Sequence, residues 1–81
     1  MKYRIGEQWE TYRTKVIPKS AGAVQLQETR RAFYAGAEAM YRVVMEMLSP
    51  ESEPTEADIQ AMQEIMQEMA SFAKDVVDGK A

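Results

Sequence analysis

QETRRAFYAGAEAMYR, residues 27–42, predicts the long helix around which the rest of the chain is arranged. When this region is placed on a helix at about 100° per residue, its apolar side chains form one continuous stripe. The stripe consists of Leu26, Phe33, Ala37, Met40, Val44 and Met47. Tyr34, Tyr41, Met45 and Leu48 widen it on one side, and Val43 widens it on the other. We expect a helix from about residue 23 to residue 48, ended by Ser49 and Pro50.

The segment before this helix predicts a shorter one. Its apolar residues recur at the spacing of a single helical face. They are Ile5, Trp9, Tyr12 and Val16. Pro18 ends the pattern, because the residue before a proline is pushed out of the helical region.

The segment after residue 48 predicts a third helix with signals at both ends. Thr55 and Asp58 have the spacing of a capping box, with Asp in place of the usual Glu or Gln. Gly79 is placed to act as the C-cap. Between them, apolar residues alternate at spacings of three and four, and Ile65 and Phe72 widen the seam. The seam is Ile59, Met62, Met66, Met69, Ala73 and Val76.

These patterns predict an all-α fold in which residues 1–81 form one helical domain. We expect a short N-terminal helix followed by a long antiparallel helical hairpin, the elements of a small helical bundle. The apolar sector of the central helix covers about half of its circumference, more than the ~100° stripe of a surface helix. Partly exposed tyrosines could account for some of this width. We nevertheless expect a homo-oligomer, since so short a chain buries only about 60–65% of its unfolded surface.

The predicted oligomer interface lies on the central helix. Its residues are Phe33, Gly36, Met40 and Val44. A glycine inside a helix costs about 1 kcal/mol relative to alanine, and close approach of another helix usually offsets that cost. Gly36 therefore predicts a tight helix crossing, and a hollow for a ligand is the alternative.

The composition argues against several functions. The chain has no cysteine and no histidine, so it lacks thiolate ligands, disulfides and the commonest general base. It also has no glycine-rich phosphate loop and no nucleophile-base arrangement. We expect no enzyme activity, no metal and no cofactor. Duplex nucleic acid is not an expected partner, because the pI is about 4.9 and the basic residues form no dense stripe. The N-terminus lacks the apolar run of a signal peptide, so we expect a cytoplasmic protein.

Charge is unevenly distributed along the chain. Residues 1–42 contain eight Lys and Arg against four Asp and Glu, whereas residues 43–81 contain two against nine. This division predicts either a basic half that faces an anionic ligand or helices that complement one another.

Arg30 falls inside the apolar sector, aligned with Tyr34 and Tyr41. Arg30 and Tyr34 are four residues apart, so the guanidinium can lie on the ring face. Such a pair could take a phosphate while the ring stacks on a base. The alternative, which we favour, is an ion pair at an interface, with Glu28 or with an acid of the third helix. The candidate residues for binding a ligand or a partner are Arg30, Arg31, Tyr34 and Tyr41.

Two resemblances add to these predictions. The stretch VQLQETRRAFYAGAEAMYR, with WETYR and VIP before it and PTEAD after it, resembles small proteins of tailed phages and prophages. The spacing of Gly36, Met40, Arg42 and Val44 is similar to that in the central helix of phage anti-CBASS sponges. Those are small helical proteins that oligomerise and sequester cyclic oligonucleotide signals. The resemblances imply a phage protein that acts by binding, in the cytoplasm of the host cell.

Two functions fit these observations. The first is an inhibitor or accessory factor that docks on a host or phage protein, and the resemblance to small phage proteins favours it slightly. The second is an anti-defence sponge that holds a cyclic nucleotide in an oligomeric pocket, with Arg30, Arg31 and Tyr34 near the ligand. A basic pocket would favour the sponge, whereas an exposed apolar patch bordered by acids would favour protein docking.

Overall fold

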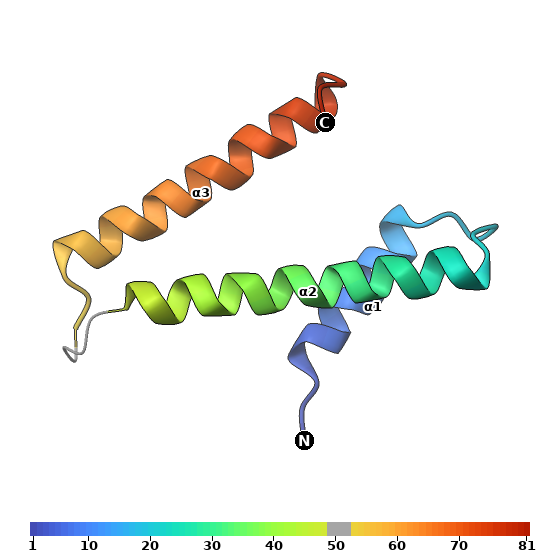
Figure 1. Cartoon of the computed structure of the whole chain (residues 1–81), viewed down its shortest axis with the longest axis horizontal. Helices are drawn as coiled ribbons and strands as arrows, with labels where there is room; N and C mark the ends of the chain where they lie inside the picture. The colour runs from blue at the N-terminus through green and yellow to red at the C-terminus, as the bar shows by residue number, and fades with distance from the viewer. Residues whose placement is uncertain (49–52) are drawn as a thin grey trace. The chain divides into compact units, whose positions relative to one another are not determined.

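The computed structural model describes residues 1–48 and 53–81. These residues form three helices, α1 (Arg4–Val16), α2 (Ala23–Met47) and α3 (Glu56–Val77), and they contain no strand (Figure 1). The prediction of an all-α, three-helix chain is confirmed. The predicted stop at Ser49 and Pro50 lies outside the described residues. Within the described ranges, none of the helices has the length and apolarity required to cross a membrane.

Packing holds α1 in place more than its ends do. Its N-cap residue, Tyr3, makes no side-chain capping hydrogen bond. At the other end Ile17 adopts an extended conformation, with φ −85° and ψ 126°, as the following Pro18 requires. Basic residues Arg13 and Lys15 lie in the last turn, where they complement the helix dipole.

Local hydrogen bonds fix both ends of α3. The backbone N–H of Asp58 donates to the Thr55 hydroxyl and the N–H of Thr55 donates to the Asp58 carboxylate, both at 3.1 Å, so the capping box is confirmed. At the other end Gly79 has φ +74° and its N–H donates to the carbonyl of Val76 at 3.2 Å. The N–H of Lys80 donates to the carbonyl of Asp75 at 2.8 Å, which completes a Schellman motif.

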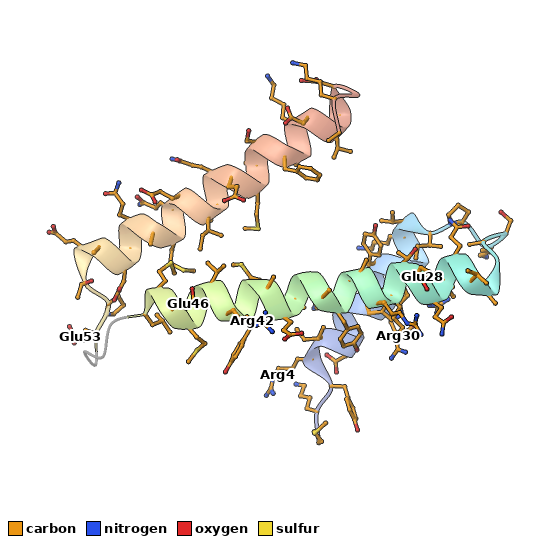
Figure 2. All side chains as sticks on the ribbon, viewed as in Figure 1. Arg4, Glu28, Arg30, Arg42, Glu46 and Glu53 are labelled. Atoms are coloured by element: carbon orange, nitrogen blue, oxygen red, sulfur yellow. The ribbon has the colours of Figure 1, made fainter. Side chains whose placement is uncertain are left out.

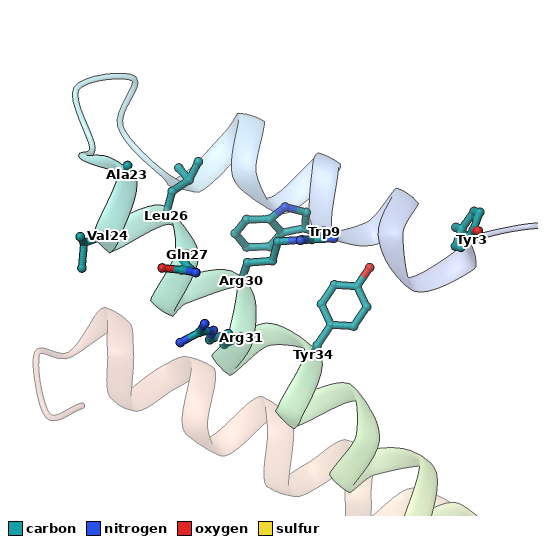
Figure 3. A pocket seen from close by; sticks show the side chains of 9 residues that line it. All are labelled: Tyr3, Trp9, Ala23, Val24, Leu26, Gln27, Arg30, Arg31 and Tyr34. Atoms are coloured by element: carbon teal, nitrogen blue, oxygen red, sulfur yellow. The ribbon is translucent and has the colours of Figure 1, made fainter.

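The chain divides into two compact units, Met1–Val43 and Val44–Ala81. Because α2 runs through the boundary, this division does not decide the prediction of one domain. The N-terminal unit consists of α1 and most of α2, and α1 lies across the first half of α2 (Figures 1 and 3). The C-terminal unit consists of the last turn of α2, the connection and α3. The pairing of α2 and α3 as a hairpin stays a prediction.

An aromatic cluster forms the core of the N-terminal unit. Trp9 is 3% exposed and is the one buried apolar side chain among the described residues. Its ring centroid lies 5.5 Å from that of Phe33 and 6.1 Å from that of Tyr12. Tyr12 and Phe33 are themselves 5.5 Å apart, so three rings join α1 to α2. Two of the four residues predicted to share one face of α1, Trp9 and Tyr12, therefore lie in this cluster.

Candidate ligand-binding groove

A groove of about 1050 Å³ lies between α1 and α2 in the N-terminal unit (Figure 3). Its residues come from both helices and from the segment before α1. They are Tyr3, Trp9, Ala23, Val24, Leu26, Gln27, Arg30, Arg31 and Tyr34. Two of them are arginines and none is an aspartate or glutamate. In a chain with a net charge of −3, this groove is a local concentration of positive charge beside apolar surface.

Arg30 lies on the ring of Tyr34, as its spacing predicted. The guanidinium carbon is 5.4 Å from the ring centroid, within the range of a cation–π contact. In residues 1–48 and 53–81, no Asp or Glu forms an ion pair with Arg30. The side chain is exposed, so its guanidinium is available to an anion that enters the groove.

Glu28 does not pair with Arg30 within the chain. Glu28 and Arg30 leave α2 in different directions (Figure 2), because two residues on a helix are about 200° apart. Glu28 instead pairs with Arg31, one turn away, at 3.2 Å. Both partners are largely exposed, and such surface pairs contribute only about 0.2–0.5 kcal/mol. Arg31 can therefore exchange this partner for a ligand at little cost.

Tyr34 reaches across the groove to α1. An ideal Cβ on Gly6 would lie 3.3 Å from the Tyr34 hydroxyl oxygen and 3.4 Å from the Cβ of Tyr3. Gly6 thus provides space for the phenol against the backbone of α1, which explains a glycine inside a helix. The sequence alone does not reveal this role, because no local spacing connects Gly6 to a residue 28 positions later.

The groove brings together three of the four predicted binding residues, Arg30, Arg31 and Tyr34. The fourth, Tyr41, lies two turns further along α2, is 65% exposed and does not line the groove. Trp9 and Gln27 line it but were not predicted to do so. Gln27 lies three residues before Arg30 on the same side of α2, which is a signal that could have identified it.

Some side chains of the predicted oligomer interface are already packed or half-buried within a single chain. Phe33 packs on Trp9 and Tyr12, and Met40 and Val44 are half-buried. Gly36 is exposed, and within the N-terminal unit no atom lies within 4 Å of an ideal Cβ at this position. The unit itself therefore supplies no helix that crosses at Gly36. A crossing with a second copy stays a prediction.

A second surface of interest is the apolar face of α3. We define the α3 face as the large exposed side chains of the predicted seam together with Phe72. Its residues are Ile59, Met62, Met66, Met69, Phe72 and Val76, each 41–63% exposed. An apolar face of this length is typical of a surface that binds another helix or protein.

Neither a metal site nor a known relative assists the functional assignment. Among the described residues, no three Asp or Glu side chains gather as a metal ion would require. No protein-family model matches the chain, and neither a curated protein nor a solved structure does. The resemblances to phage proteins and to anti-CBASS sponges stay predictions, and the geometry of the two surfaces carries the argument.

Proposed function

We propose that this protein acts by binding, and that the groove between α1 and α2 sequesters a small anionic ligand with a planar ring, such as a nucleotide signal. The observation that carries the proposal is the lining of the groove: two accessible guanidinium groups, no carboxylate and an aromatic ring beside them. A volume of about 1050 Å³ is sufficient for a ligand of this size.

The charged and the apolar side chains of the groove have different roles in recognising the ligand. The planar guanidinium groups of Arg30 and Arg31 can each donate two parallel hydrogen bonds to a phosphate. Leu26 and the ring of Tyr34, which both point toward α1 in Figure 3, offer apolar surface on which a ring of the ligand can pack. Since the sequence contains no histidine or cysteine, the ligand is expected to be held and released without chemical change.

Binding of nucleotides to charge-matched variants tests this proposal. In isothermal titration with adenosine monophosphate, ATP and a cyclic dinucleotide as probes, Arg30→Ala should weaken binding about tenfold or more, the loss of one charge-assisted pair. Arg42→Ala is the matched control, because Arg42 is an exposed arginine of α2 that pairs with Glu38 and does not line the groove. It should bind like the parent. Failure of the parent to bind any of the three probes, or equal losses in the two variants, would contradict the proposal.

The α3 face supports a second candidate function, that of an inhibitor or accessory factor that docks on a host or phage protein. Its exposed methionines favour this function, since methionine side chains adapt to partners of different shape. Under this hypothesis, Met66→Lys should abolish inhibition or co-purification of the partner, whereas Arg30→Ala should leave both unchanged. The opposite pattern would favour the groove.

A further inference from the structure

The boundary between the two units coincides with the division of charge. Met1–Val43 contains eight Lys and Arg against four Asp and Glu, a net charge of +4. Val44–Ala81 contains two against nine, a net charge of −7. A second copy of the chain therefore offers each unit a surface of opposite charge.

The α3 face has an acidic border. Glu64, Glu68, Phe72 and Asp75 follow one another at spacings of four, four and three residues, so they share one edge of the helix, and this edge adjoins the α3 face on the side of Phe72. Glu64 and Glu68 are exposed, and within the described ranges neither forms an ion pair. A partner for this surface must therefore offer apolar side chains beside cations.

One edge of α1 has this composition. We define the α1 edge as Tyr12, Lys15 and Val16 together with Lys19, which follows the helix. Tyr12 and Val16 are partly exposed, and Lys15 and Lys19 are exposed and form no ion pair in the described part of the chain. None of the four lines the groove, so this edge is separate from the proposed ligand site.

We propose that the α3 face of one copy docks on the α1 edge of a second copy, with the reciprocal contact closing a symmetric dimer. Burial of methionine, phenylalanine, tyrosine and valine side chains supplies the affinity. Pairing of Glu64 and Glu68 with Lys15 and Lys19 at the rim fixes the orientation and accelerates encounter. Two identical contacts related by a two-fold axis leave no unpaired α3 face, so the assembly does not extend further.

Charge reversal on the two edges tests the dimer. Lys15→Glu/Lys19→Glu and Glu64→Lys/Glu68→Lys should each weaken self-association about tenfold in sedimentation equilibrium at low salt, because attraction becomes repulsion at both contacts. An equimolar mixture should recover a heterodimer with an affinity near that of the parent. In that heterodimer one contact is native and the other has both charges exchanged, so both are complementary.

A control variant separates the loss of the α1 edge from the change in net charge. Lys74→Glu/Lys80→Glu changes the net charge by the same amount as Lys15→Glu/Lys19→Glu but leaves the α1 edge intact, so it should not weaken the dimer. All variants change exposed positions, and circular dichroism checks that their helix content is preserved. A monomeric parent, a mixture that fails to associate, or equal weakening by the control would overturn the proposal. An α3 face that binds another protein but not a second copy would also overturn it.

Discussion

Trp9 in the middle of α1 is 3% exposed, whereas Met66 in the middle of α3 is 63% exposed. Their N-termini show the reverse order of local stabilisation. The N-terminus of α3 has a complete capping box, whereas that of α1 has no side-chain cap. In α1, aromatic packing on α2 fixes the helix. In α3, hydrogen bonds between neighbours in the sequence fix the ends, and the apolar face is exposed within its own unit. A helix of the first kind belongs to the core, and one of the second kind is suited to binding.

The largest effect is expected from removing the aromatic contact of α1. Trp9→Ala should lower the free energy of unfolding of the N-terminal unit by about 3–5 kcal/mol, since it empties the centre of the three-ring cluster. Met66→Ala, the matched truncation on α3, should cost only about 0.5 kcal/mol when the chain is monomeric, because this side chain is exposed. Urea unfolding followed by circular dichroism measures both. Equal losses would show that the two helices are held in the same way.

A smaller effect is expected from removing the cap of α3. Thr55→Ala should destabilise the first turn by about 1 kcal/mol, because the N–H of Asp58 loses its acceptor. Amide hydrogen exchange should accelerate at the start of α3 and remain unchanged in α1. Thr55→Ser keeps the hydroxyl and should preserve protection. Faster exchange in both helices would mean that α3 stabilises α1. This would contradict the conclusion that packing on α2 fixes α1.

The smallest effect concerns two glycines that differ in their surroundings. Gly36→Ala should stabilise the chain by up to about 1 kcal/mol, because the methyl group enters open space and improves helix propensity. Gly6→Ala should give less of this gain, because the methyl group meets the Tyr34 hydroxyl. The double variant Gly6→Ala/Tyr34→Phe removes that oxygen and should recover the gain in thermal unfolding. A loss of stability in Gly36→Ala would instead support the helix crossing predicted from the sequence.

Local features of the fold were predictable, and features that depend on tertiary contacts were not. The helices and the caps at Thr55 and Gly79 follow from residues within a few positions of one another. The stack of Arg30 on Tyr34 was also predictable, because a spacing of four residues places both on one side of a helix. The phenol's approach to Gly6 and the place of Trp9 beside the groove depend on how α1 lies on α2, which no short spacing encodes.

The buried indole also makes the chain its own spectroscopic reporter. Trp9 is the only tryptophan, so the wavelength of its fluorescence follows water entry into the N-terminal unit alone. The far-ultraviolet dichroism, in contrast, sums over α1, α2 and α3. If the two signals change together on heating, the units unfold as one cooperative body. If they separate, the gap between the two midpoints measures how far each unit unfolds independently.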